Sequence, residues 1–193
     1  MATPELEREI AVLLAAGDHA AAATTALNGL GPQIVGYLGA TLRDDDAAHD
    51  VFAHFCEQLW KSLPTFRGES SFKTWAYKLV LHSVGRYRRD GFRTRGRALA
   101  SSEAAALAEE IHSRTAPYLR TDVKDRIAEL RASLDPTDQT LLFLRVDQGL
   151  SWNEVAEVMS EEGEPVAPAA LRKRFERAKE RLRELAKQHG LLE

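Results

Sequence analysis

Five side chains between residues 75 and 89 have the types and spacing of a surface that binds single-stranded or distorted nucleic acid. Their steps of 3, 4, 4 and 3 residues place them on one helical face, and they are Trp75, Lys78, His82, Arg86 and Arg89. Lysine and arginine follow the phosphates, while an exposed ring stacks on a base that has left the duplex. A single aromatic residue more often packs in a core, so core packing is the alternative interpretation of Trp75 and of Tyr77.

A second face of the same stretch is expected to pack against the preceding helices. Its members step by 4, 3, 4 and 4 residues, and they are Phe72, Ala76, Leu79, Ser83 and Tyr87. In the turn before this helix, Phe66, Arg67 and Gly68 could add to the nucleic-acid surface.

The charge of the chain is distributed unevenly. Its net charge is −3, yet residues 66–97 hold nine basic residues against two acidic ones, and residues 171–187 hold eight against three. Everything else is therefore strongly acidic. Two separate basic islands are expected where two surfaces meet a polyanion, whereas either island alone would be interpreted as a solvated helix face.

Helical periodicity is frequent along the chain and strand-like alternation does not persist, so the sequence predicts an all-α fold. The first half is expected to hold four helices before Ser71: residues 5–16, residues 20–27, a helix opened by Pro32, and residues 47–63. Asp44 to Asp46 place acids where the last of these begins.

The second half is predicted to be a separate small helical domain. Residues 93–124 have few large apolar side chains and are interpreted as a linker, of which residues 103–112 could be helical. Beyond it come a helix over residues 137–146, a capping box formed by Ser151 and Glu154, and a long basic helix opened by Pro168. Helix, turn, capped helix, turn and basic helix is the helix-turn-helix plan, whose last helix enters the major groove.

Several classes of protein are excluded or disfavoured. The single cysteine, Cys56, permits neither an intramolecular disulfide nor a cysteine metal cage. The chain lacks the charge order of a secretory signal and has no run of about eighteen apolar residues, so we expect a cytoplasmic protein without membrane insertion. His49 and His54 are five residues apart and share no helical face, and no glycine-rich phosphate loop follows a strand. The sequence thus predicts no enzyme, no metal and no cofactor.

Three segments resemble the polymerase-binding and promoter-binding domains of bacterial sigma factors of the extracytoplasmic-function group. They are LLAAGDHAAAATTAL, FRGESSFKTWAYKLVLHSVGRYRRD, and LDPTDQTLLFLRVDQGLSWNEVAEVM followed by LRKRFERAKERLREL. The resemblance covers nearly the whole chain, and FRGESSFKTW is the more specific motif. It implies two helical domains, a region-two-like domain over residues 1–92 and a region-four-like helix-turn-helix domain over residues 125–193, joined by the linker at 93–124.

The resemblance also implies a role for each matched position. Residues 70–89 would capture and help melt the minus-ten promoter element, with His82 where the family reads a flipped base. The implied single-strand contacts are Phe66, Arg67, Ser70, Lys73, Trp75, Lys78, His82, Arg86 and Arg89. The implied contacts to the minus-thirty-five element are Arg172, Lys173, Arg174 and Arg177. The implied docking residues for core RNA polymerase are Asp45, Asp46, His49, Asp50 and Glu57, with His49 standing where the family usually has glutamine.

The resemblance names core RNA polymerase and promoter DNA as partners, and the family often works with an anti-sigma factor. One departure concerns residues 160–165, which lengthen the turn before the recognition helix and carry three acids. Either this loop points away from DNA, or the domain binds its site unusually or weakly. The alternative functions are a free-standing helix-turn-helix regulator and an interaction module whose basic faces are merely solvated.

Overall fold

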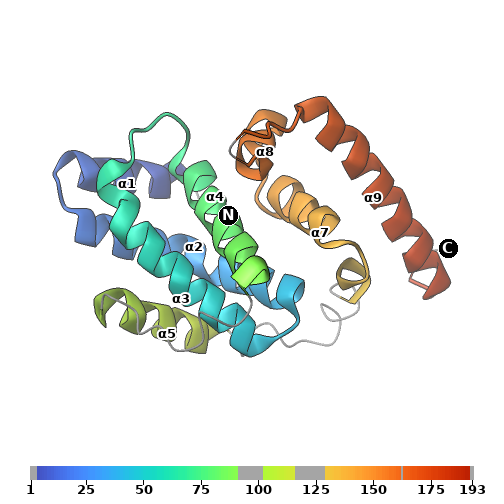
Figure 1. Ribbon diagram of the computed structural model, residues 1–193, viewed down its shortest axis with the longest axis horizontal. Coiled ribbons are helices and arrows are strands. Elements are labelled where there is room, and N and C mark those ends of the chain that lie inside the picture. The colour runs from blue at the N-terminus through green and yellow to red at the C-terminus, as the bar shows by residue number, and fades with distance from the viewer. Residues whose placement is uncertain (1–3, 91–101, 116–128, 162, 192–193) are drawn as a thin grey trace. The chain divides into compact units, whose positions relative to one another are not determined.

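The computed structural model describes residues 4–90, 102–115, 129–161 and 163–191, and every regular element within them is helical (Figure 1). The only extended pairing among these residues is an isolated bridge between Glu161 and Glu164. The predicted all-α class is confirmed. The chain divides into two compact units, residues 1–118 and 119–193. No helix of the described ranges combines the length and the apolarity that crossing a membrane requires.

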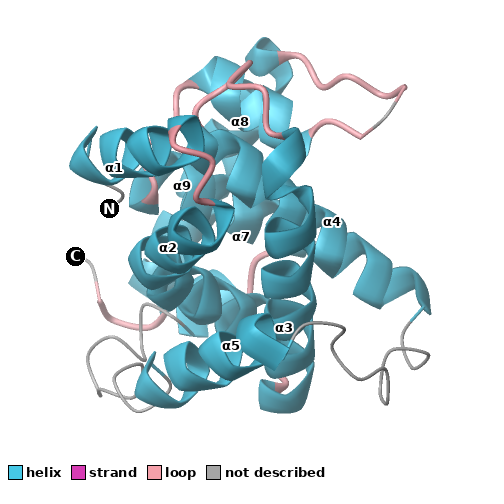
Figure 2. Cartoon of the chain, turned by 90° about the vertical axis from the view of Figure 1, so that its left-hand side faces the viewer, coloured by secondary structure: helices cyan, strands magenta, loops and turns pink. Residues whose placement is uncertain are grey.

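Among its described residues, the first unit contains five α-helices and one short 3-10 helix. They are α1 (Pro4–Ala15), α2 (His19–Leu42), α3 (Asp45–Ser62), η1 (Leu63–Thr65), α4 (Phe72–Asp90) and α5 (Ser102–Thr115). α2 packs against α1, α3 and α5, while α3 also packs against α4 and α5 (Figure 2). The core of this unit therefore lies around α2 and α3.

α2 is one continuous helix, whereas the sequence predicts two helical stretches with Pro32 opening the second. Pro32 lies inside the helix, where a proline removes one backbone hydrogen bond. On both sides of it the helix is buried: Leu27 and Leu30 precede it, and Ile34 and Leu38 follow it, all at most 1% exposed. Burial of these side chains against α1, α3 and α5 outweighs the lost bond, so tertiary packing decides the continuity of α2.

α3 begins two residues before its predicted start, because Asp44 caps it directly after Arg43 has closed α2. Asp44 accepts a hydrogen bond from the Ala47 amide at 3.0 Å, and Arg43 adopts a left-handed φ of 53° that closes α2. The apolar side chains that the sequence assigns to this helix are buried: Val51, Phe52, Phe55 and Leu59 are each at most 2% exposed.

α5 lies within the stretch interpreted as a linker, and it packs against α2 and α3. Its apolar side chains recur at Ala104, Ala108 and Ile111, and all three are at most 1% exposed. Gly31 of α2 makes room for Ile111, because a Cβ atom at Gly31 would lie 2.9 Å from the Ile111 Cγ2 atom. This helix is therefore part of the first unit's core, and the other residues of the predicted linker lie outside the described ranges.

The second unit contains α7 (Pro136–Leu142), a π-helical segment η3 (Phe143–Asp147), α8 (Trp152–Met159) and α9 (Pro168–Gln188). The helix predicted over residues 137–146 is thus present, with its last turn widened. The predicted capping box is confirmed: the Ser151 amide donates to the Glu154 carboxylate at 2.7 Å, and the Ser151 hydroxyl accepts from the Glu154 amide at 3.3 Å. α8 packs against α9, and α9 also packs against α7.

The lengthened turn between α8 and α9 is closed at its base by Ser160. Its hydroxyl donates to the Ala156 carbonyl at 2.7 Å and accepts from the Val166 amide at 2.9 Å. Glu161 and Glu164, inside the closed segment, are exposed. Ser160 thus joins the end of α8 to Val166, two residues before α9 begins.

Candidate nucleic-acid interface

Three aromatic rings cluster where the turn after η1 meets the first turn of α4. Ring centroids lie 5.0 Å apart between Phe66 and Trp75, 5.3 Å between Phe72 and Trp75, and 5.4 Å between Phe66 and Phe72. Phe72 is buried at 3% exposure, while Phe66 and Trp75 are half-buried. Both interpretations of Trp75, core packing and an exposed stacking ring, therefore apply in part. Its ring packs on Phe72, and part of the side chain stays exposed.

The buried face of α4 is rotated slightly from the predicted one. Phe72, Ala76 and Ser83 are buried as expected, but Leu79 and Tyr87 are only half-buried. Tyr77, at 1% exposure, belongs to the core instead, and burial raises the pKa of its phenol. Core packing is the correct interpretation for Tyr77.

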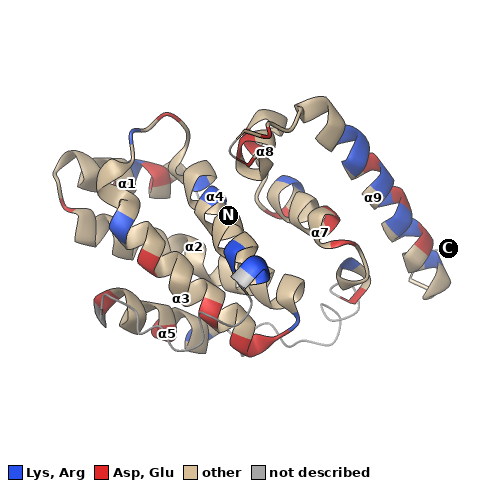
Figure 3. Ribbon diagram, in the orientation of Figure 1, with Lys and Arg blue, Asp and Glu red and all other residues tan. Residues whose placement is uncertain are grey.

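Cations line the rest of α4 (Figure 3). His82, Arg86 and Arg89 are exposed, and Lys73 and Lys78 are half-buried. In the preceding turn Ser70 is half-buried, and Arg67 is exposed with its Nη1 atom 3.9 Å from Glu69. The structure thus brings the sequence-predicted cations and the aromatic cluster onto the same helix and its adjoining turn.

A small hollow separates α3 from the middle of α4. It is lined by Asp50, Val51, His54, Ser83, Arg86 and Tyr87. His54 connects the two helices, since its Nδ1 atom lies 3.1 Å from the Ser83 hydroxyl and its Nε2 atom lies 3.4 Å from the Arg86 guanidinium. These contacts fix the middle of α4 on α3.

α3 presents an acidic face that contains three of the predicted docking residues. Asp46, Asp50 and Glu57 are separated by four and seven residues and therefore share one side of the helix. Asp46 and the neighbouring Asp45 are exposed, and Glu57 is half-buried and forms an ion pair with Lys61.

His49, the remaining predicted docking residue, points toward α5. Its Nε2 atom lies 2.8 Å from the Glu109 carboxylate, and its ring centroid lies 4.9 Å from that of His112. The hydrogen bond to His49 lowers the pKa of Glu109, and burial lowers the pKa of His112, with a further contribution from His49. The sequence did not indicate these contacts, because 60 residues separate His49 from Glu109.

In the second unit, the four predicted basic residues of α9 fall into different environments. Lys173 and Arg177 are exposed. Arg172 is exposed and lies over the Trp152 ring, with its guanidinium carbon 5.6 Å from the ring centroid, and Arg145 also contacts that ring at 5.1 Å.

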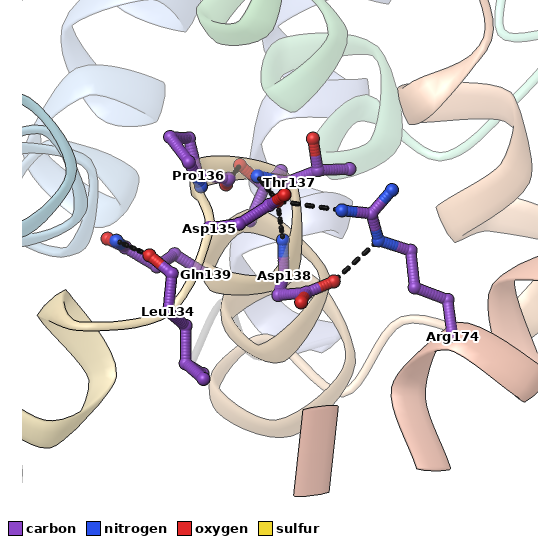
Figure 4. A network of polar contacts seen from close by, with 8 residues as sticks. Leu134, Asp135, Pro136, Thr137, Asp138, Gln139 and Arg174 are labelled. Carbon is purple, nitrogen blue, oxygen red and sulfur yellow. Dashed lines mark hydrogen bonds and ion pairs between the residues drawn. The ribbon is translucent and has the colours of Figure 1, made fainter. Parts of the chain in front are cut away.

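Arg174 differs from the other three because carboxylates of α7 and its cap hold it (Figure 4). Its guanidinium lies 2.7 Å from Asp135 and 2.5 Å from Asp138. Asp135 is the N-cap of α7 and also accepts from the Thr137 and Asp138 amides. Arg174 therefore joins α9 to α7, and its contact to the minus-thirty-five element stays a prediction.

Nucleophilic and metal chemistry find no support among the described residues. Burial raises the pKa of the Cys56 thiol, which is fully buried, so the reactive thiolate is disfavoured. No group of three potential metal ligands occurs within the ranges that the structure describes.

Comparison with known proteins decides the family. Residues 27–94, which include α3 and α4, match the model of the sigma-70 region 2 family. The chain is 26% identical over 137 residues to the RNA polymerase sigma-H factor of Pseudomonas aeruginosa, covering 66% of this chain and 69% of that protein. It is 28% identical over 129 residues to the RNA polymerase sigma factor YlaC of Bacillus subtilis, covering 66% and 73%.

The chain belongs to the bacterial RNA polymerase sigma factors of the extracytoplasmic-function group. As a sigma factor it directs transcription initiation through RNA polymerase. The predicted family and function are thus confirmed. The region 2 match ends at residue 94, so roles for the residues of the second unit rest on its own geometry.

One contact to α4 of this sigma factor was not foreseen. Glu7 of α1 binds the first amides of α4 across 65 residues of sequence. In the sequence, Glu7 is one of several acidic residues of the first helix. Only the tertiary structure shows where its carboxylate lies.

Proposed function

We propose that this sigma factor captures the unpaired strand of the minus-ten element on the outer side of α4. The observation that carries the proposal is the half-exposed aromatic cluster of Phe66 and Trp75 at the start of a helix whose other exposed residues are His82 and three arginines. Rings of this kind stack on splayed bases, and the cations follow the strand's phosphates. Capture of a flipped base offsets the few kcal/mol that unstacking costs.

Individual contacts follow from position on α4 and its preceding turn. Phe66 and Trp75 stack on bases near the start of the helix, and His82 reads a flipped base further along. The remaining contacts are to phosphate or sugar, and they are made by Arg67, Ser70, Lys73, Lys78, Arg86 and Arg89.

Docking on core polymerase is assigned to the acidic face of α3. Asp46, Asp50 and Glu57, together with Asp45 at the helix start, present carboxylates to basic residues of the enzyme. His49, another member of the predicted set, is contacted by α5 through Glu109 and His112. The first unit thus offers acids on α3 and cations on α4.

The second unit is assigned to the minus-thirty-five element as a helix-turn-helix domain. α8 and α9 have the order of a supporting and a recognition helix, and Lys173 and Arg177 are exposed near the start of α9. Arg172 contributes from its position over Trp152. Arg174 is assigned to holding α9 in place, since two carboxylates bind it.

Purified chain mixed with core RNA polymerase tests the proposal. We expect co-elution and a transcript that depends on the promoter, and loss of co-elution in an Asp46→Lys, Asp50→Lys double variant. Glu9→Lys is the matched control, because it reverses an exposed acidic charge on another helix, α1. Stable binding to duplex DNA without any association with polymerase would favour a free-standing regulator. If the chain bound neither polymerase nor duplex DNA, the interaction module would be favoured.

A further inference from the structure

Glu7 closes the N-terminus of α4 from another helix. One carboxylate oxygen of Glu7 lies 3.0 Å from the Phe72 amide nitrogen, and the other lies 2.9 Å from the Lys73 amide nitrogen. Glu7 is half-buried in α1, and 65 residues separate it from Phe72. This contact is a bidentate N-cap supplied across the fold.

The first amides of a helix have no partner within the helix, and the helix dipole favours an anion at that end. Ser71 satisfies the Thr74 amide through its hydroxyl at 3.1 Å, which leaves the amides of Phe72 and Lys73 for Glu7. Hydrogen bonds to a carboxylate are stronger than those between neutral groups. Glu7 and Ser71 together therefore fix the entire first turn of α4.

α1 is itself firmly seated beside this contact. Leu6, the neighbour of Glu7, packs onto α2 at Gly29, where a Cβ atom would lie 2.5 Å from the Leu6 Cδ2 atom. A residue larger than glycine at position 29 would force the Leu6 side chain to move. Glu7 thus holds α4 from a helix that packs closely on α2.

The first turn that Glu7 caps carries the aromatic cluster. Phe72 donates its amide to Glu7, and its ring lies 5.3 Å from Trp75 and 5.4 Å from Phe66. We propose that Glu7 is a positioning residue for promoter opening, which holds the start of α4 so that Trp75 and Phe66 face the unpaired strand. The inference rests on the function proposed for α4.

Charge alone predicts the opposite effect of neutralising Glu7. The carboxylate occupies a helix N-terminus that could otherwise attract a DNA phosphate. If Glu7 acted only through its charge, Glu7→Gln would bind the promoter strand more tightly. If Glu7 acts by position, Glu7→Gln opens the promoter more slowly, because a neutral amide offers one acceptor oxygen where two amides need one each.

The test compares Glu7→Gln, Glu7→Asp and Glu9→Gln in the full chain bound to core polymerase. Glu9→Gln makes the same charge change on the same helix at an exposed position. We expect Glu7→Gln to slow open-complex formation on the order of tenfold, which corresponds to the loss of a charge-assisted hydrogen bond. The affinity for core polymerase should change less than about twofold. Glu7→Asp, which keeps both acceptors, should recover part of the rate, and Glu9→Gln should match the wild type.

Opening at the wild-type rate in Glu7→Gln would overturn the inference, as would tighter strand binding with faster opening. Equal losses of core binding and opening in both Glu7 variants would also overturn it, because Glu7 would then merely support the fold. Failure of the wild-type chain to bind core polymerase would instead refute the proposed function, so the two failures are told apart by the wild-type sample.

Discussion

The Nε atom of Arg174 in α9 lies 2.5 Å from a carboxylate oxygen of Asp138 in α7 (Figure 4). A second nitrogen of the same guanidinium lies 2.7 Å from Asp135, the N-cap residue of α7. One side chain of the proposed recognition helix thus fastens that helix to the start of another. The basic residues of α9 therefore divide into one that holds the helix and others that remain exposed.

Replacing Arg174 by methionine should destabilise the second unit rather than weaken DNA contacts directly. Removing the guanidinium leaves two carboxylates without their partner, and we expect a loss of about 1–3 kcal/mol in the free energy of unfolding. Urea unfolding measures it. Arg183→Met is the matched control, because Arg183 pairs with exposed Glu180 on the same helix at 3.0 Å, and such pairs contribute about 0.5 kcal/mol or less. Equal effects of both changes would contradict the assignment.

The same cluster gives the second unit a defined sensitivity to acid. Partial burial raises the pKa of Asp135, but hydrogen bonds from the Asp138 and Thr137 amides, together with Arg174, outweigh it and hold the pKa below 3.8. A carboxyl whose pKa falls on folding stabilises the fold above its unfolded pKa. This contribution should be complete above about pH 4 and should decline as the pH falls below it. Asp135→Asn should flatten that part of the stability profile, and an unchanged profile would contradict this account.

Arg177 should contribute to duplex binding without contributing to stability. If it contacts a phosphate, Arg177→Ala lowers the slope of log affinity against log salt concentration by about one. The slope is measured by titrating duplex promoter DNA at several salt concentrations. Lys173→Ala should behave similarly, since Lys173 is also exposed near the start of α9. An unchanged slope in both variants would remove them from the interface.

Acid should loosen α5 from the first unit through His112. Burial lowers the pKa of His112 below its usual 6.5, His49 adds to this effect, and Glu109 and Asp45 oppose it. A histidine whose pKa falls on folding does not lower the free energy of unfolding above pH 6.5, where it is neutral in both states. Below that pH it lowers this free energy increasingly, because the unfolded state binds the proton more readily. After correction for the intrinsic exchange rate, which itself rises with pH, the amides of α5 should therefore be less protected at about pH 5.5 than at about pH 7.5. His112→Asn should remove this difference, and its persistence would assign the effect to another group.

The sequence predicted best what local patterns determine. The helices, the Ser151 and Glu154 capping box and the acidic start of α3 all depend on residues within a few positions of one another. The continuity of α2 through Pro32 was missed, because burial of Leu30 and Ile34 on either side of the proline outweighs a rule about local backbone bonding.

Contacts between distant residues account for the remaining differences. Arg174 and Lys173 are adjacent in the sequence and carry the same charge. The local sequence therefore does not indicate that Arg174 is the one that Asp135 and Asp138 bind. The same holds for His49 with Glu109 and for Glu7 with Phe72, where 60 and 65 residues intervene. The side chains of the candidate site were predictable from type and spacing, but the residues that hold them required the tertiary structure.

Trp75→Ala in the polymerase-bound protein tests the central claim most directly, by comparing promoter opening with core affinity. Opening is read from the reactivity of unpaired minus-ten thymines to permanganate. Loss of one stacked base is expected to reduce opening by about tenfold or more, since stacking contributes about 1–3 kcal/mol per base, while core affinity and the thermal midpoint stay close to wild type. Trp75→Phe should recover part of the opening. Equal losses of opening and core affinity, or an unfolded first unit, would show that Trp75 serves only the core and would contradict the account.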